Sequence, residues 1–169
     1  MLRIRMLSGA EVASIPVEDL SDVRALKQTL HMFHSLPPRF RQRLVLRGDP
    51  LDDTTRLDSP LDLELVLLEY STAPETNSDE LLTAAANGCA SEVEALLQQP
   101  QHPDVVNVYG TSPLIEASLQ GHVEVVRLLL EAGADKDLTN NDGISALMRA
   151  SVCGHAEVAR LLLEAGADT

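Results

Sequence analysis

The stretch GHVEVVRLLLEAGAD, residues 121–135, returns almost unchanged as GHAEVARLLLEAGAD, residues 154–168. The two copies begin 33 residues apart, and the same step back from Gly121 leads to Gly88. Self-similarity at one fixed period is the signature of an array in which each repeat packs against its neighbours. The repeat therefore decides the fold of the second half of the chain.

Two repeats open with a second motif. Residues 110–114 are Gly-Thr-Ser-Pro-Leu, and residues 143–147 are Gly-Ile-Ser-Ala-Leu. With the period of 33 residues, they resemble the Gly-x-Thr-Pro-Leu-His motif of ankyrin repeats. The resemblance implies an α-helical ankyrin-repeat solenoid and a surface that binds proteins rather than a catalytic pocket. We expect a linker and three repeats, at residues 71–77, 78–110, 111–143 and 144–169, the last repeat being incomplete.

The motif also makes local predictions. Ser112 and Ser145 are placed to cap the first helix of their repeats. Ile115 and Met148 stand where the family has a His that ties neighbouring loops, so we expect softer turns. The resemblance implies that His122 and His155 pack and hydrogen-bond between repeats.

The third repeat stops before its loop closes. This indicates either a fragment of a longer array or an end that another chain covers. Leu161, Leu162 and Leu163 cannot all face inward on one helix, so we expect at least one of them to face the vacant side.

The first seventy residues follow another pattern. Alternating apolar residues from Leu2 indicate a half-buried strand, and a second strand is expected over residues 10–17. Ser21 is expected to cap a helix, and further alternating leucines predict strands near Leu44 and Leu65. This order indicates an α+β domain with the helix across one sheet face. The expected inward stripe of the helix is Val23, Leu26, Leu30 and Phe33.

Several segments of this half resemble ubiquitin. They are Leu-Pro-Pro at 36–38, Gln-Arg-Leu-Val-Leu-Arg-Gly at 42–48, Leu-Asp-Asp at 51–53 and Leu-Glu-Leu-Val-Leu at 63–67. The resemblance implies a ubiquitin-like β-grasp domain over residues 1–70. It departs from ubiquitin at the end of the last strand, which lacks Gly-Gly and continues into the repeats. We therefore expect an integral domain rather than a conjugated modifier, with Lys27 on the buried side of its helix.

The resemblance also carries over an interaction patch. Ubiquitin presents Leu, Ile and Val to its receptors, and the matching positions are Leu7, Val45 and Val66, all expected on the outward phase of strands. Arginines frame this trio: Arg5, Arg43 and Arg47. An apolar centre with a charged rim is typical of an interface. The alternatives are scattered surface aliphatics, or a patch that the repeats cover, and Glu64 reverses the local charge.

In ankyrin arrays, loop tips and the first helix of each repeat contact the target. Tyr109 is the best anchor among the matching positions, because Tyr is enriched at interface hot spots. The alternative is that Leu119 and Val152 pack against neighbouring repeats. The candidate residues are Val108, Tyr109, Thr111, Leu119 and Gln120 in the second repeat, and Asn141, Asp142, Ile144, Val152 and Cys153 in the third.

Composition excludes several classes of function. The net charge is −13, and residues 73–169 hold fifteen acids against four bases, which disfavours nucleic acid and anionic membranes as partners. No apolar stretch approaches the roughly 20 residues of a membrane span. The first residues predict a strand rather than a secretion signal. Cys89 and Cys153 are expected to be reduced thiols of a cytoplasmic or nuclear protein.

No constellation of catalytic residues is present. The sequence has neither Ser/His/Asp spacing nor a Gly-rich phosphate loop, and nothing converges on His31 and His34. We expect no catalytic residue, metal, cofactor or small-molecule substrate. The sequence favours a non-catalytic adaptor, whose repeats bind a client protein while the ubiquitin-like domain docks to ubiquitin-reading machinery. The alternatives are a plain ankyrin scaffold capped by the β-grasp domain, or the regulatory part of a longer enzyme.

Overall fold

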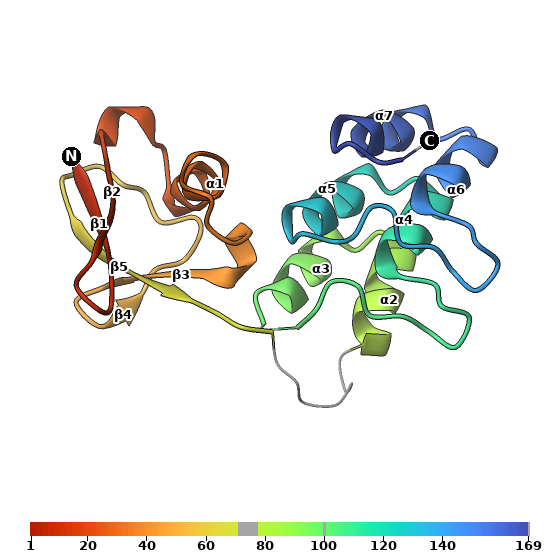
Figure 1. Ribbon diagram of the computed structural model, residues 1–169, viewed down its shortest axis with the longest axis horizontal. Coiled ribbons are helices and arrows are strands. Elements are labelled where there is room, and N and C mark those ends of the chain that lie inside the picture. Colours follow the sequence, from red (N-terminus) through yellow and green to blue (C-terminus); the bar gives the residue numbers. More distant parts are fainter. Residues whose placement is uncertain (71–77, 100, 169) are drawn as a thin grey trace. The chain divides into compact units, whose positions relative to one another are not determined.

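The structure, a computed structural model, describes residues 1–70, 78–99 and 101–168. The chain divides into two compact units, Met1–Glu69 and Tyr70–Thr169 (Figure 1). Each unit has its own core, and each is described separately below.

The first unit is a five-stranded mixed sheet with one long helix. The strand order is β2-β1-β5-β3-β4, in which β1 and β5 are parallel and the other pairs are antiparallel. Helix α1 lies across one face of this sheet. The elements are β1 (Leu2–Met6), β2 (Glu11–Ile15), η1 (Val17–Asp19), α1 (Val23–His34), η2 (Arg39–Arg41), β3 (Gln42–Leu46), β4 (Asp49–Pro50) and β5 (Asp62–Leu67).

Alternation along the strands builds the core of this unit, because successive side chains point to opposite faces. Leu2 and Ile4 are fully buried, as are Leu44 and Leu65 on the strands beside them. These residues pack against the inward stripe of α1, formed by Val23, Leu26 and Leu30. Phe33, expected in the same stripe, is 76% exposed, so that prediction was wrong. The helix ends after His34, and Ser35 adopts a left-handed conformation (φ 53°).

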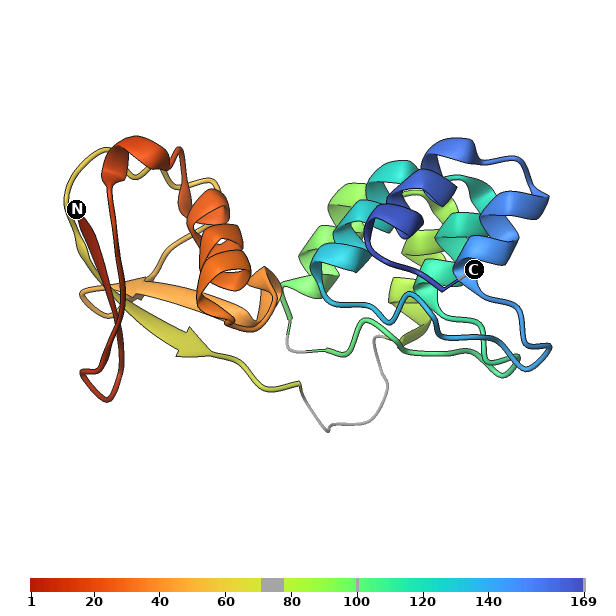
Figure 2. The ribbon, with the colours of Figure 1, turned by 45° about the horizontal axis from the view of Figure 1, so that its top comes forward.

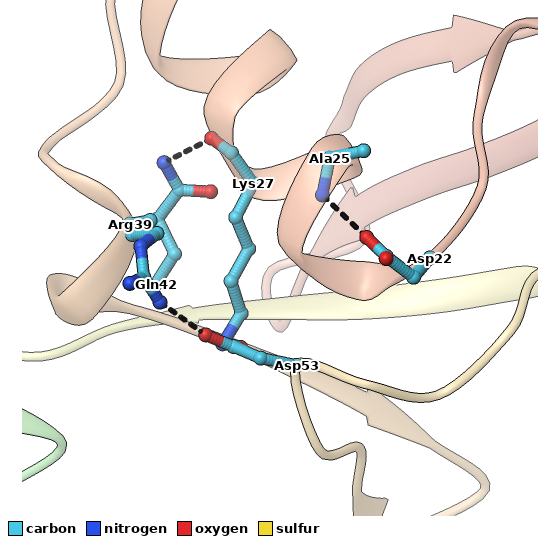
Figure 3. Close-up of polar contacts among 6 residues, drawn as sticks. All are labelled: Asp22, Ala25, Lys27, Arg39, Gln42 and Asp53. Atoms are coloured by element: carbon cyan, nitrogen blue, oxygen red, sulfur yellow. Dashed lines mark hydrogen bonds and ion pairs between the residues drawn. The ribbon is translucent and has the colours of Figure 1, made fainter. Parts of the chain in front are cut away.

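The cap of α1 is also not the expected residue. Ser21 precedes the cap, and Asp22 occupies it, accepting a hydrogen bond from the Ala25 N–H at 2.8 Å (Figure 3). Asp22 is bridged to Arg56, a contact with a distant segment that local spacing does not reveal. Both residue types cap helices well, so the backbone position of the first turn decided between them.

A buried ionic cluster closes this unit beneath α1. The Asp53 carboxylate contacts Lys27 Nζ through one oxygen and Arg39 Nη1 through the other, both at 2.6 Å (Figure 3). Gln42 Nε2 donates to the carbonyl oxygens of Lys27 at 3.0 Å and of Pro37 at 2.7 Å. Lys27 is only 4% exposed, as the sequence predicts. Buried charges are tolerated when they are paired in this way.

The second unit consists of helix pairs that recur at the period of the sequence. Helices α2, α4 and α6 form one row, and α3, α5 and α7 form a second row beside it, as both views show (Figures 1 and 2). The helices are α2 (Ser78–Asn87), α3 (Ala90–Leu97), α4 (Pro113–Gln120), α5 (Val123–Glu131), α6 (Ala146–Val152) and α7 (Ala156–Glu164). We call the pairs α2–α3, α4–α5 and α6–α7 repeats 1, 2 and 3.

The predicted caps of repeats 2 and 3 are present. Ser112 Oγ accepts from the Ile115 N–H at 3.4 Å, and Ser145 Oγ accepts from the Met148 N–H at 3.3 Å. Pro113 occupies the first turn of α4, where its missing N–H costs nothing. The period and these side chains together fix where each repeat begins.

Candidate protein-interaction surfaces

Two loops project between the helix pairs, and one asparagine organises each of them. We call residues 107–111 and 140–144 the finger loops. Asn107 Oδ1 accepts from the N–H groups of Tyr109 at 2.9 Å and Thr111 at 3.0 Å. Thirty-three residues later, Asn140 Oδ1 accepts from Asp142 at 3.1 Å and Ile144 at 2.9 Å. Neither asparagine was among the residues predicted from the motifs, although the 33-residue period pairs them and could have identified them.

The finger loops are joined by two hydrogen bonds from Asn141 to backbone carbonyls of the first loop. The Asn141 N–H donates to Tyr109 O at 3.0 Å, and Asn141 Nδ2 donates to Val108 O at 3.3 Å. Gly110 allows this approach, because a Cβ at this position would lie 2.5 Å from Asn141 Oδ1. The side chains of Val108 and Tyr109 are left 86% and 71% exposed on this supported tip. A large aromatic side chain held outward on a fixed loop is suited to anchor a partner.

The other candidate positions of the repeats differ in exposure. Val152 on α6 is 85% exposed, whereas Leu119, the matching residue of α4, is half-buried. The same contrast separates Met148, 51% exposed, from Ile115, 1% exposed. Helix α4 packs between α2 and α6, whereas α6 packs mainly against α4 and α7 among the described helices. Of the remaining candidates, Thr111 and Ile144 are half-buried, and Gln120, Asn141, Asp142 and Cys153 are exposed.

The outward face of the N-terminal sheet brings two of the three patch residues together with charges. Val66 on β5 lies opposite Arg43 on β3, and Val45 lies opposite Glu64. Arg5 on β1 pairs with Glu64 from the other side. Val45 and Val66 are half-buried, and Arg43 is exposed. The face is therefore a mixture of aliphatic and alternating charged side chains.

Leu7 does not share this strand geometry. It lies in the turn that follows β1, one residue beyond Met6, with 69% of its surface exposed. The prediction that it sits on the outward phase of a strand was wrong, because the turn begins one residue earlier than expected. Arg47 is exposed at the β3–β4 turn in a left-handed conformation (φ 55°).

Two equivalent aspartates link the repeats. Asp104 Oδ1 accepts from the Asp135 N–H at 2.9 Å, and Asp137 Oδ1 accepts from the Asp168 N–H at 2.7 Å. Burial raises the pKa of Asp104, against the hydrogen bond from Asp135 and the charge of His102. The hydrogen bond from Asp168 and then that from Lys136 lower the pKa of Asp137. The same backbone contact is thus made in two electrostatic environments.

The repeats are also tied together by histidine, as the sequence predicts. His122 Nε2 contacts Ala86 O, and His155 Nε2 contacts Leu119 O, each at 3.0 Å. Cys89 and Cys153 are free and exposed. Within the described part of the chain, no group of three or more His, Cys, Asp or Glu side chains could hold a metal ion. No helix of that part is long and apolar enough to cross a membrane.

Comparison with protein families identifies the second unit. The model of a family described as ankyrin repeats, in three copies, matches residues 81–169, more than half of the chain. The chain belongs to the ankyrin-repeat family. Ankyrin repeats serve protein–protein interaction and are typically non-catalytic, so residues 81–169 form a protein-binding module. A search of curated proteins found no match.

Proposed function

We propose that this protein is a non-catalytic adaptor. Its ankyrin repeats bind a client protein through the finger loops and α6, and its N-terminal unit docks to ubiquitin-reading machinery as a ubiquitin-like β-grasp domain. The observation that carries the proposal is the exposed pair Val108 and Tyr109, held on a tip that Asn107 and Asn141 brace. Preorganised aromatic anchors lower the entropic cost of binding.

Charge favours a client with a basic rim. The unit Tyr70–Thr169 holds fifteen acidic and four basic residues, so its potential attracts cationic surfaces and repels phosphates. Apolar side chains at the finger tips then meet an apolar centre in the partner, and the surrounding acids meet its basic rim.

The assignment of a β-grasp domain is supported by strand order and by the core. A mixed sheet ordered β2-β1-β5-β3-β4, with α1 packed on one face, agrees with the fold that the ubiquitin resemblance implies. The buried Lys27 fits an integral domain that no longer serves as a branch point. The free thiols Cys89 and Cys153 fit a cytoplasmic or nuclear location.

Docking to ubiquitin receptors would use Val45 and Val66, with Leu7 at the edge. Since Glu64 lies beside Val45, the receptor would need a polar or basic group at that point. The same glutamate favours the alternative of a plain ankyrin scaffold, in which the β-grasp domain is an N-terminal cap and binds no receptor.

Titration of isolated ubiquitin-receptor domains with the full chain tests the docking step. Val45→Asp is expected to abolish binding, because it places a charge at the apolar centre. It also sets a second acid opposite Glu64, at a cost of about 0.2–1 kcal/mol in stability. Val45→Lys avoids this cost and should abolish binding equally.

Ser14→Asp, at an exposed position of β2 opposite Arg3, is the matched control for Val45→Asp and should bind as the parent does. If the parent binds no receptor domain, or if both Val45 variants bind normally, the scaffold alternative replaces the adaptor.

A further inference from the structure

Lysine is scarce in this chain. The 169 residues contain eleven arginines but only two lysines, Lys27 and Lys136. Both residue types carry a positive charge, but the guanidinium stays protonated, whereas the ε-amine becomes a nucleophile when it loses a proton. Modification directed at lysine side chains is therefore confined to two positions, and these two side chains differ greatly in solvent exposure.

Lys27 is enclosed by the first unit. Its side chain is 5% exposed, and its Nζ lies 2.6 Å from Asp53, which also holds Arg39 (Figure 3). The carbonyl oxygen of the same residue accepts from Gln42 Nε2 at 3.0 Å, so its backbone is held as well. An acyl donor can reach this amine only when the unit opens and the buried Asp53 is left with one partner fewer.

Lys136 lies in the second unit, at the junction of repeats 2 and 3. Its side chain is 31% exposed, with Nζ 2.9 Å from Asp137 Oδ2. The other oxygen of Asp137 accepts from the Asp168 N–H of the last repeat. A Cβ on Gly166 would lie 3.7 Å from Lys136 Cε, so the side chain passes close to the last turn, and about a third of it remains exposed.

The charges around Lys136 slow its reaction without blocking it. The hydrogen bond and charge of Asp137 raise the pKa of Lys136, and Asp135 and Asp168 add to the effect. A smaller fraction of the amine is neutral at pH 7 than for a free lysine, but no unfolding is needed to expose it.

We propose that Lys136 is the acceptor for lysine-directed acylation within residues 1–169, and that Lys27 is excluded while its unit is folded. The ammonium first gives a proton to solvent. The neutral Nζ then attacks the carbonyl carbon of an activated acyl compound, forming a C–N bond. The bond from that carbon to the leaving group breaks, and the leaving group takes up the second proton shed by nitrogen. The product is a neutral amide among Asp135, Asp137 and Asp168.

Competitive acetylation of the full chain tests this assignment. The folded protein is treated with a limiting amount of N-acetoxysuccinimide at neutral pH, and occupancy of both lysines is measured by peptide mass spectrometry. Lys27 should react about a thousandfold or more slowly than in denaturant, because folded domains are open in about one molecule in a thousand or fewer. Lys136 should react at a rate only severalfold below its rate in denaturant.

Two variants separate accessibility from the ion pair. Asp137→Asn should speed acetylation of Lys136 severalfold, whereas Asp142→Asn, an exposed acid of the second finger loop, should leave the rate unchanged. Lys136→Arg should remove side-chain acetylation of the folded protein. The assignment is overturned if Lys27 reacts as fast as Lys136 in native buffer, or if both are equally protected. No change in Asp137→Asn would overturn the role of the ion pair.

Discussion

At the scale of single residues, glycine and histidine form a matched pair across each boundary between repeats. His155 Nε2 contacts Leu119 O, and since a carbonyl oxygen only accepts, this nitrogen carries the proton. The ring lies so close to Gly121 that a Cβ there would be 2.5 Å from Nδ1. The same arrangement joins His122 to Gly88. Each glycine thus leaves room for the histidine of the following repeat.

Alanine at these glycines provides a direct test. Gly121 and Gly154 adopt nearly the same left-handed conformation (φ 78° and 75°), but nothing described lies within 4 Å of a Cβ on Gly154. Gly154→Ala should lose about 1–2 kcal/mol through backbone strain alone. Gly121→Ala should lose about 1–3 kcal/mol more, because His155 must move and Leu119 O loses its donor. Urea unfolding followed by circular dichroism measures the difference, and equal losses would contradict the account.

Asp104 and Asp137 predict opposite responses to the same substitution. Because the pKa of Asp104 is raised above the ordinary aspartate value of 3.8, its charge disfavours the folded state at neutral pH. The pKa of Asp137 is lowered, so its charge stabilises the fold above pH 3.8, and this stabilisation is lost as the pH falls through the folded-state pKa.

Asparagine keeps an oxygen acceptor at either position and removes the charge. Asp104→Asn should therefore raise the melting temperature at pH 7, and Asp137→Asn should lower it. The effect at Asp104 should shrink as the pH falls through its raised folded-state pKa and should be gone below about 3.8, where the unfolded aspartate is protonated. The effect at Asp137 should shrink only as the pH falls below about 3.8 towards its lowered folded-state pKa. Thermal melts at pH 7 and pH 3 provide the measurement. Shifts of the same sign at pH 7 would show that the hydrogen bonds, not the charges, dominate.

At the scale of secondary-structure elements, equivalent helices have unequal surroundings. Ile115 on α4 is 1% exposed and Met148 on α6 is 51% exposed, although they occupy the same position one repeat apart. The expectation that one of three leucines of α7 faces outward agrees with the structure, in which Leu163 is 48% exposed and Leu162 is fully buried. The helices of repeat 3 therefore carry interior-type side chains on an uncovered face.

Truncation of this pair should distinguish covered from uncovered positions. Ile115→Ala should cost about 2–5 kcal/mol, because it leaves a cavity between packed helices. Met148→Ala should cost less than about 1 kcal/mol, since about half of that residue is already exposed to water. Urea unfolding gives both values. Equal costs would mean that Met148 is covered in solution, and sedimentation at two protein concentrations would then identify self-association.

The sequence predicted repeating elements better than singular ones. The period located α4 to α7, and the serine caps follow from motifs that occur twice. Ser21 and Phe33 were misassigned because tertiary contacts override local patterns. The bridge between Asp22 and Arg56 lies at the start of α1. Lys27, although charged, occupies a buried position on the helix because it is paired with Asp53. Such contacts join residues far apart in the chain and leave no local periodicity.

The candidate surfaces likewise contain some features that the sequence could predict and others that it could not. Exposure of Tyr109 and Val108 could be expected from their place in a motif. The position of Glu64 between Arg5 and Val45 could not, because it depends on the register of three strands. Likewise, β1 ends at Met6, one residue before the alternating pattern predicts, so Leu7 lies in the turn that follows the strand.

At the scale of the whole molecule, the chain combines an acidic ankyrin module with a nearly neutral α+β unit. Residues 73–169 hold fifteen acids and four bases, and residues 1–72 hold eleven acids and nine bases. Binding of a basic client by the repeats should therefore weaken as ionic strength rises, whereas apolar contacts made by Val45 and Val66 should respond less. The central claim is that the finger loops and α6, not the row formed by α3, α5 and α7, make the client contact.

Site-specific photocrosslinking tests that claim most directly. Benzoylphenylalanine is placed in the full chain at Tyr109, 71% exposed on the first finger loop, or at Glu124, whose side chain is 63% exposed on α5. After irradiation in cells, crosslinked proteins are identified by mass spectrometry. We predict that the probe at Tyr109 captures a reproducible client that the probe at Glu124 does not. Identical capture at both positions, or crosslinks from Tyr109 only within its own chain, would contradict the account.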